Sequence, residues 1–183
     1  MKQESNVRYI LRLALTLLAI CAVVSGLLSG VNAITKDRIA AIQAEKIEKA
    51  LQQVLPGVTG LEKQTLSGDT GIVRTVYASG DSFAVEVAPG GFDGEITMMV
   101  GITGGKVTGI SIISHTETPG LGAVAAADSA KGEAFRNQFV GLVSGITVDG
   151  EENSIDSMSG ATITSKAVTA GVNAALDFVA NLG

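Results

Sequence analysis

The chain has 183 residues, 46% of them apolar and 4% aromatic, with 23 glycines and no tryptophan. This length favours one domain with an appendage. Small aliphatic side chains can fill the core of a domain of this size. The net charge of −5 argues against a nucleic-acid binder, which would carry a basic face. The only cysteine is Cys21 and the only histidine is His115, which excludes an internal disulfide framework and a multi-histidine zinc site built by this chain alone.

Residues 13–35 contain no charged side chain. About 20 apolar residues span a bilayer as a helix, so we expect a transmembrane helix here, after a tail of residues 1–12. A cleaved signal peptide is the alternative, because Val31-Asn32-Ala33 is an acceptable cleavage site. The apolar stretch is longer than the roughly 7–15 residues of a signal peptide, which favours an uncleaved anchor.

The orientation of this helix follows from its flanking cations. The numbers of cations before and after the helix differ little, but a short N-terminal tail is easily retained in the cytoplasm. We therefore expect a single-pass protein of the cell (inner) membrane with residues 1–12 in the cytoplasm and the C-terminal domain outside it. The nearby cations are Lys2, Arg8 and Arg12 before the helix and Lys36, Arg38, Lys46 and Lys49 after it.

Residues 36–57 have apolar side chains at helical spacing and end at Pro56-Gly57, which predicts a stalk helix. Residues 58–183 form the predicted extracytoplasmic domain. Four runs rich in Val, Ile and Thr, separated by Gly-containing turns, predict antiparallel strands in this domain. These runs are residues 72–79, 82–89, 95–103 and 106–114.

The remaining elements of the domain are predicted to be mostly helical. Residues 127–142 have Phe135 and Phe139 on one side, with Asp128 or Ser129 as the N-cap. A short strand is expected within residues 145–150. A final helix follows, in which Val168, Val172, Leu176 and Val179 recur at helical spacing. The predicted class is α+β: a twisted antiparallel sheet with packed helices, preceded by one N-terminal transmembrane helix.

The first candidate site is the hydroxyl-rich run DSMSGATITSK, residues 156–166, which lies where a turn meets the last helix. A helix N-terminus offers unpaired N–H groups and binds anions, phosphate above all. Gly160 allows close approach of the backbone. The simpler interpretation is that a hydroxyl in this run only caps the helix.

The second candidate site is the loop SHTETPGLGA, residues 114–123. Pro119-Gly120 fits a type II turn, and the simple interpretation is a connector. A hydrolase would use His115 with a nucleophile, but the chain has no Gly-x-Ser-x-Gly elbow. A metal site that uses His115 and Glu117 is a further alternative.

The two candidate sites together resemble the FMN-binding domain family. Residues 156–162, DSMSGAT, are similar to its flavinylation motif Asp-x-x-(Ser/Thr)-Gly-Ala-Thr, and residues 115–122 to its His-x-Glu-Thr-Pro-Gly-Leu-Gly loop. Residues 90–102, GGFDGEITMMVGI, resemble its Gly-Phe-x-Gly strand entry. With its span and stalk, nearly the whole chain resembles the G subunits of the Rnf ion-translocating electron-transport complex.

The resemblance implies that Thr162 carries FMN through a phosphoester bond, which a flavin transferase forms from FAD. It also implies electron relay within a ferredoxin:NAD⁺ oxidoreductase, in which this chain is not catalytic alone. The implied partners are the other membrane subunits, including the flavinylated D subunit and the A and E subunits. The implied cofactor-binding residues are Thr162, Asp156, Ser159, Gly160, Ala161, Thr164, Ser165, His115, Glu117, Thr118, Pro119, Gly120, Leu121 and Gly122, and no catalytic or metal-binding residue is expected.

Three other functions stay open at this point. The C subunit of the sodium-pumping NADH:quinone reductase shares both motifs but is usually longer. A stand-alone extracytoplasmic FMN electron-transfer protein would also carry them. In a non-redox binding or scaffold module, the hydroxyl-rich run would be a helix cap.

Overall fold

A computed structural model describes residues 2–66 and 70–182 of the chain. The chain forms two compact units, Met1–Glu45 and Lys46–Gly183. Helix α1, Lys2–Val54, is continuous and contributes its last turns to the second unit. The division between the units therefore falls inside the segment predicted as a stalk, residues 36–57.

In the first unit, α1 exposes large apolar side chains such as Leu17 and Leu28, which are 64% and 66% exposed. Within the described residues, α1 is the one helix that is long and apolar enough to cross a bilayer. It continues through the possible cleavage site at Val31–Ala33 without a break. An apolar helix surface of this length is stable in lipid rather than in water.

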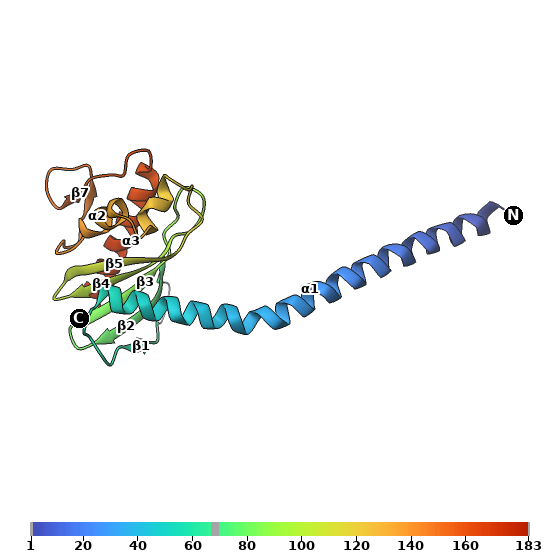
Figure 1. Cartoon of the computed structure of the whole chain (residues 1–183), viewed down its shortest axis with the longest axis horizontal. Coiled ribbons are helices and arrows are strands. Elements are labelled where there is room, and N and C mark those ends of the chain that lie inside the picture. The colour runs from blue at the N-terminus through green and yellow to red at the C-terminus, as the bar shows by residue number, and fades with distance from the viewer. Residues whose placement is uncertain (1, 67–69, 183) are drawn as a thin grey trace. The chain divides into compact units, whose positions relative to one another are not determined.

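The second unit is built on a five-stranded antiparallel sheet in which each strand pairs with the next along the chain (Figure 1). This meander follows from short β-branched runs separated by glycine turns. The strands are β1, Glu62–Gln64; β2, Val73–Ser79; β3, Ser82–Val87; β4, Thr97–Thr103; and β5, Lys106–Ser114. The four strands predicted from the sequence correspond to β2–β5.

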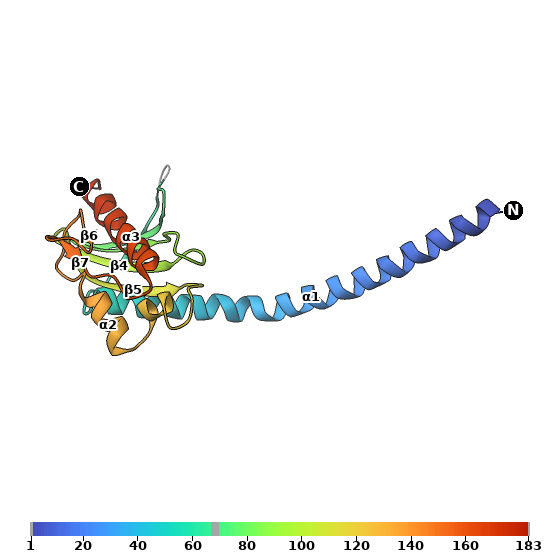
Figure 2. The same ribbon diagram turned by 90° about the horizontal axis from the view of Figure 1, so that it is seen from above.

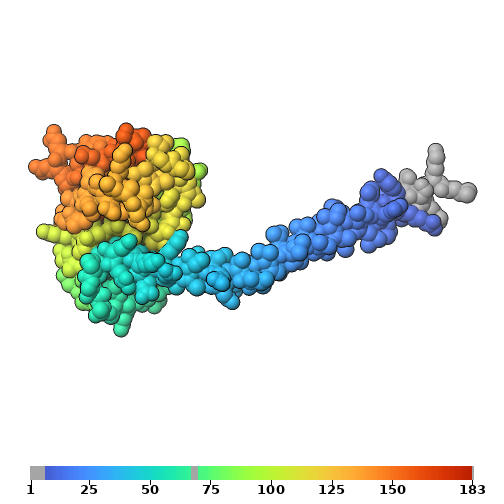
Figure 3. All heavy atoms as spheres, in the orientation of Figure 1, coloured from blue at the N-terminus to red at the C-terminus, as the bar shows by residue number. Residues whose placement is uncertain are grey.

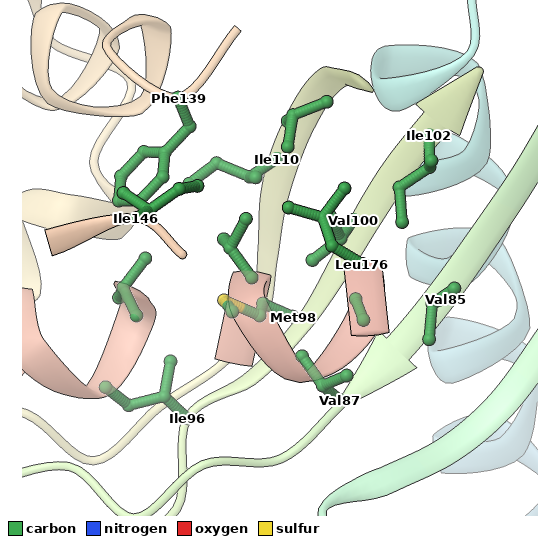
Figure 4. Close-up of a cluster of buried hydrophobic side chains, with 14 of the residues drawn as sticks. Val85, Val87, Ile96, Met98, Val100, Ile102, Ile110, Phe139, Ile146 and Leu176 are labelled. Carbon is green, nitrogen blue, oxygen red and sulfur yellow. The ribbon is translucent and has the colours of Figure 1, made fainter. Parts of the chain in front are cut away.

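Helix α3, Thr162–Ala180, covers one face of the sheet and the last turns of α1 lie against the other (Figure 2). Alternation along β4 divides its side chains between the faces. Met98 and Val100 pack under α3 with Leu176 (Figure 4), whereas Met99 packs against the end of α1 with Val54. The α+β class and the antiparallel sheet with packed helices are confirmed.

The end of α1 needs glycine on the sheet beneath it. A Cβ on Gly101 would lie 2.4 Å from the carbonyl oxygen of Val54, too close for any real contact. The Thr108 hydroxyl donates to the same carbonyl at 2.6 Å. The Ser111 hydroxyl donates to the side-chain oxygen of Gln53 at 2.6 Å. The last turns of α1 are therefore an integral part of the second unit.

The segment between β5 and α3 contains less regular structure than the sequence predicts. It holds the 3₁₀ helix η1, Gly122–Ala126; α2, Ala130–Asn137; and a parallel pair of short strands, β6, Thr147–Val148, and β7, Ser154–Ile155. Ser129 is the N-cap of α2 and accepts from the Gly132 N–H. The predicted helix 127–142 was too long, because the chain after Asn137 turns to exchange hydrogen bonds with Val107 on β5.

Candidate functional site

The hydroxyl-rich run ends at the first residues of α3, but its hydroxyls do not cap the helix. The N-cap is Ala161, which has no side-chain hydrogen bond. The Ser165 hydroxyl is fully buried, accepts from the Met158 N–H at 3.0 Å and donates to the Ala161 carbonyl at 3.0 Å. This pair of bonds fixes the turn before α3. Thr162 is exposed, so its hydroxyl is accessible at the helix N-terminus.

The loop after β5 contains the expected tight turn at Pro119-Gly120. Gly120 has φ of +78°, which is the left-handed value that a type II turn requires at this position. The Leu121 N–H donates to the Thr118 carbonyl at 3.2 Å and closes the turn. The turn presents Leu121, which is 45% exposed, beside Gly160: a Cβ on Gly160 would lie 3.1 Å from a Leu121 methyl.

Glu117 joins this loop to two other segments. Its carboxylate is buried and accepts from the Thr164 hydroxyl of α3 at 2.6 Å. It also accepts from the backbone N–H groups of Phe92 at 2.7 Å and Asp93 at 3.4 Å. The Thr116 hydroxyl donates to the Asp93 carbonyl in the same place. Three segments that are distant in sequence are thus held together beside Thr162.

These segments line an open cavity of about 340 Å³. Its walls are Phe92 from the loop before β4, residues 117–118 and 121–122 from the loop after β5, and residues 160–164 at the start of α3. The volume is in the range of small-ligand and cofactor sites. The walls carry apolar side chains, and the first N–H groups of α3, which have no helical partners, lie beside them. The apolar walls fit an aromatic ring system, and the unpaired N–H groups fit a phosphate group.

The predicted site residues do not all line this cavity. Eight of them do: Glu117, Thr118, Leu121, Gly122, Gly160, Ala161, Thr162 and Thr164. Ser165 is buried and fixes the turn before α3, and Pro119 lies in the turn that the Leu121 N–H closes. Asp156, Ser159 and Gly120 line a second hollow of about 370 Å³ against α2, and Leu121 lies between the two cavities. In Figure 3 the yellow and orange segments that form this hollow lie side by side on the surface of the second unit.

His115 does not line the cavity. It is half-buried, and its Nδ1 atom is buried without a hydrogen-bond partner among the described residues. Within those residues, no three His, Cys, Asp or Glu side chains gather as a metal site would need. The alternative of a His115–Glu117 metal site thus has no third ligand in the described structure, since Glu117 is committed to Thr164 and the Phe92 loop.

Two residues of the cavity were not predicted from the sequence, Phe92 and Ile163. Phe92 lies in the Gly-Phe-Asp-Gly stretch, where it was interpreted as part of a strand entry. It is 65% exposed, which is unusual for a large aromatic side chain and is a sign of a binding surface. Ile163, 55% exposed, was interpreted as an apolar residue between two threonines of a helix start.

The acidic start of the motif is fixed by a neighbouring loop. The Ser157 N–H donates to Asp149 Oδ1 at 2.8 Å, and this bond holds the pKa of the Asp149 carboxyl below its ordinary value. Gln138, the C-cap residue of α2, makes two hydrogen bonds to the backbone of Asp156, at 2.7 Å with the Asp156 N–H and at 3.4 Å with the Asp156 carbonyl. The Asp156 side chain is exposed and accessible to another molecule.

Comparison with known proteins identifies two regions of the chain. Residues 91–177 match the FMN-binding domain family, and residues 1–54 match the family described as the RnfG N-terminal region. The first match covers the cavity and both candidate motifs, and the second covers α1 to its last residue.

Whole-length relatives agree with these matches. The chain is 32% identical to the G subunit of the Na⁺-translocating ferredoxin:NAD⁺ oxidoreductase complex of Acetobacterium woodii, over 99% of this chain and 97% of that one. It is also 32% identical to the G subunit of the ion-translocating oxidoreductase complex of Methanosarcina acetivorans, over 96% and 97% of the two chains. Both alignments run through the helix and the domain.

A solved structure shares the fold. It is the C subunit of the Na⁺-translocating NADH-quinone reductase from Parabacteroides distasonis, with a TM-score of 0.52 over 78% of this chain and 96% of that one. The sequence identity is 20%, so the likeness is one of fold.

Proposed function

Because the chain belongs to the family of G subunits of ion-translocating oxidoreductase (Rnf) complexes, we propose that it is a membrane-anchored subunit that carries FMN and relays electrons in such a complex. The observation that carries the proposal is the cavity beside Thr162, which lies within the FMN-binding domain match and is lined by both candidate motifs. FMN supplies the redox chemistry when bound, and the chain supplies its position and surroundings.

We infer that Thr162 holds FMN through a phosphoester bond. Its side chain is exposed, it lines the cavity, and it is the first residue of α3. Attachment would form a bond between the Thr162 oxygen and the FMN phosphorus of FAD and would break the bond from that phosphorus to AMP, and the hydroxyl proton would go to a base of the transferase. The helix N-terminus would then stabilise the negative phosphate.

The other residues of the cavity have roles that follow from their places. Gly160 and the Ser165 bonds shape the turn that presents Thr162. Leu121 and Phe92 supply apolar surface for a ring. Asp156, exposed at the start of the motif, is available to the transferase during attachment.

We propose that the second unit lies outside the cytoplasm. The covalent attachment proposed for FMN supports this orientation, because a weakly bound cofactor would diffuse away outside the cytoplasm. The partners in this proposal are the D subunit, the A and E subunits and a flavin transferase. The C subunit of the NADH-quinone reductase is not favoured as an identity, because its likeness to this chain is limited to the fold.

The test is in-gel flavin fluorescence of the denatured full chain after co-expression with the transferase. Thr162→Ala should abolish the fluorescence. Ser157→Ala, which removes the hydroxyl at a variable position of the same motif and keeps the backbone N–H that binds Asp149, is the matched control and should retain it. Covalent flavin in the Thr162→Ala protein would overturn the assignment, and a flavin-free wild-type chain would favour the scaffold alternative.

A further inference from the structure

A buried carboxylate forms part of the wall of the cavity that contains Thr162. Glu117 is 5% exposed, and it lines the cavity together with Leu121 and Thr162. A carboxylate is rarely buried to this extent, because the loss of hydration must be offset by hydrogen bonds or by a cation. Its presence at this position therefore needs an explanation.

Hydrogen bonds offset the burial of Glu117. Oε1 accepts from the Phe92 and Asp93 N–H groups, and Oε2 accepts from the Thr164 hydroxyl. Both oxygens act as acceptors, as in an ionised carboxylate. The two ion pairs Arg74–Glu95 and Arg136–Asp128 do not include it. Its charge is therefore solvated by dipoles.

The structure leaves room for this carboxylate by means of two glycines. A Cβ on Gly91 would lie 2.2 Å from Oε1, and a Cβ on Gly122 would lie 2.2 Å from Oε2. Neither glycine has a positive φ, so their backbone conformations do not account for them. The Glu117 carboxylate, together with Ile96 beside Gly91 and Thr164 beside Gly122, leaves no room for a Cβ at either position.

We propose that Glu117 is a positioning residue of the flavin site whose fixed negative charge lowers the reduction potential of the FMN. This inference rests on the proposed function, which places FMN in the cavity. Reduction adds two electrons and one proton to the flavin and so leaves one more negative charge in the site, with the electrons supplied by the complex. A nearby carboxylate opposes that added charge, and the low polarity of a buried position strengthens the effect.

The same carboxylate sets the geometry of the cavity. It lies four residues before Leu121, it binds the N–H of Phe92, and it binds the hydroxyl of Thr164, two residues after Thr162. The Glu117 side chain thus joins all three walls of the cavity. A change of charge at Glu117 and a change of its hydrogen bonds are separable, because different substitutions produce them.

The test is the reduction potential of the full chain in detergent, carrying flavin, measured by spectroelectrochemistry at one neutral pH. Glu117→Gln removes the charge with little change of shape and should raise the potential. Asp93→Asn removes an exposed charge from the adjoining loop and should shift the potential several times less, because solvent and salt screen it. Thr164→Val keeps the carboxylate but removes a donor to it, and should lower the potential.

The opposite signs make the proposal falsifiable. An unchanged or lowered potential in Glu117→Gln would overturn it, and so would Thr164→Val and Glu117→Gln shifting in the same direction. If Glu117→Gln does not fold, Thr164→Val decides alone, and an unchanged or raised potential there would overturn the proposal.

A measurement without flavin completes the test. In a Thr162→Ala background, Glu117→Gln should lower the unfolding temperature of the chain, because the amide accepts less strongly from the Phe92 and Asp93 N–H groups. An unchanged unfolding temperature would overturn the positioning role. A wild-type chain without flavin would overturn the proposed function, whereas a flavinylated chain with an unchanged Glu117→Gln potential would overturn this inference alone.

Discussion

Gly122→Ala is expected to damage the site through a single added methyl group. The new Cβ would lie 2.2 Å from Glu117 Oε2 and 2.5 Å from Thr164 Oγ1, whereas real Cβ contacts are essentially never below 3.0 Å. The carboxylate oxygen would have to move by at least 0.8 Å and the hydroxyl oxygen by at least 0.5 Å. These two atoms form the 2.6 Å hydrogen bond that holds the loop to α3, so the bond should be lost.

The expected cost follows from the kind of bond. A hydrogen bond to a charged group contributes about 1.5–3 kcal/mol, and a buried carboxylate that loses a donor is at the upper end. The unfolding temperature of the domain should fall by on the order of 10 °C. The assay is thermal unfolding of the full chain in detergent, followed by circular dichroism.

Gly90→Ala is the matched control for this substitution. A Cβ on Gly90 meets no atom within 4 Å, and its φ is not positive, so the change should stay within about 0.5 kcal/mol. Equal unfolding temperatures for Gly122→Ala and Gly90→Ala would refute the reasoning that the carboxylate fills the space beside Gly122.

Three further predictions concern the ring contact, the acid response and the topology. Leu121→Ala should leave flavin attachment nearly intact. It should shift the reduction potential of the flavin and slow ferredoxin:NAD⁺ electron transfer in the assembled complex. If the spectrum, the potential and the turnover were all unchanged, Leu121 would not contact the flavin. Asp149→Asn should lower the unfolding temperature at neutral pH, because a carboxyl whose pKa is lowered by folding stabilises the fold above its unfolded pKa of about 3.9 and loses that effect as the pH falls through the folded value. The difference from wild type should therefore shrink in acid, and a difference independent of pH would contradict this origin. A cysteine in place of the exposed Glu62, in a Cys21→Ala background, should react with an impermeant thiol reagent in intact cells; reaction only after lysis would reverse the topology, and a mature N-terminus at Ile34 would show cleavage.

The sheet could be predicted from local sequence, because β2–β5 are short β-branched runs between glycine turns. The attachment of α1 could not. It depends on Gly101, which gives the helix room to approach, and on the Thr108 hydroxyl, which reaches Val54 across 54 positions of the chain. A glycine within a strand indicates a close approach but does not say what approaches.

The candidate site shows the same division. The turn at Pro119-Gly120 could be predicted because local sequence determines the turn type. The partners of Glu117 could not, since Phe92 and Thr164 lie 25 and 47 positions away in sequence. Phe92 was missed because an aromatic side chain between glycines has no periodicity to reveal which surface it faces.

The central claim is that Thr162 carries FMN, and the most direct test is the intact mass of the purified full chain with its modified residue mapped by peptide sequencing. The protein should be produced together with a flavin transferase. The account predicts one added FMN phosphoryl group per chain, located on Thr162. An unmodified Thr162 in a protein that carries covalent flavin elsewhere, or no added mass at all, would contradict it.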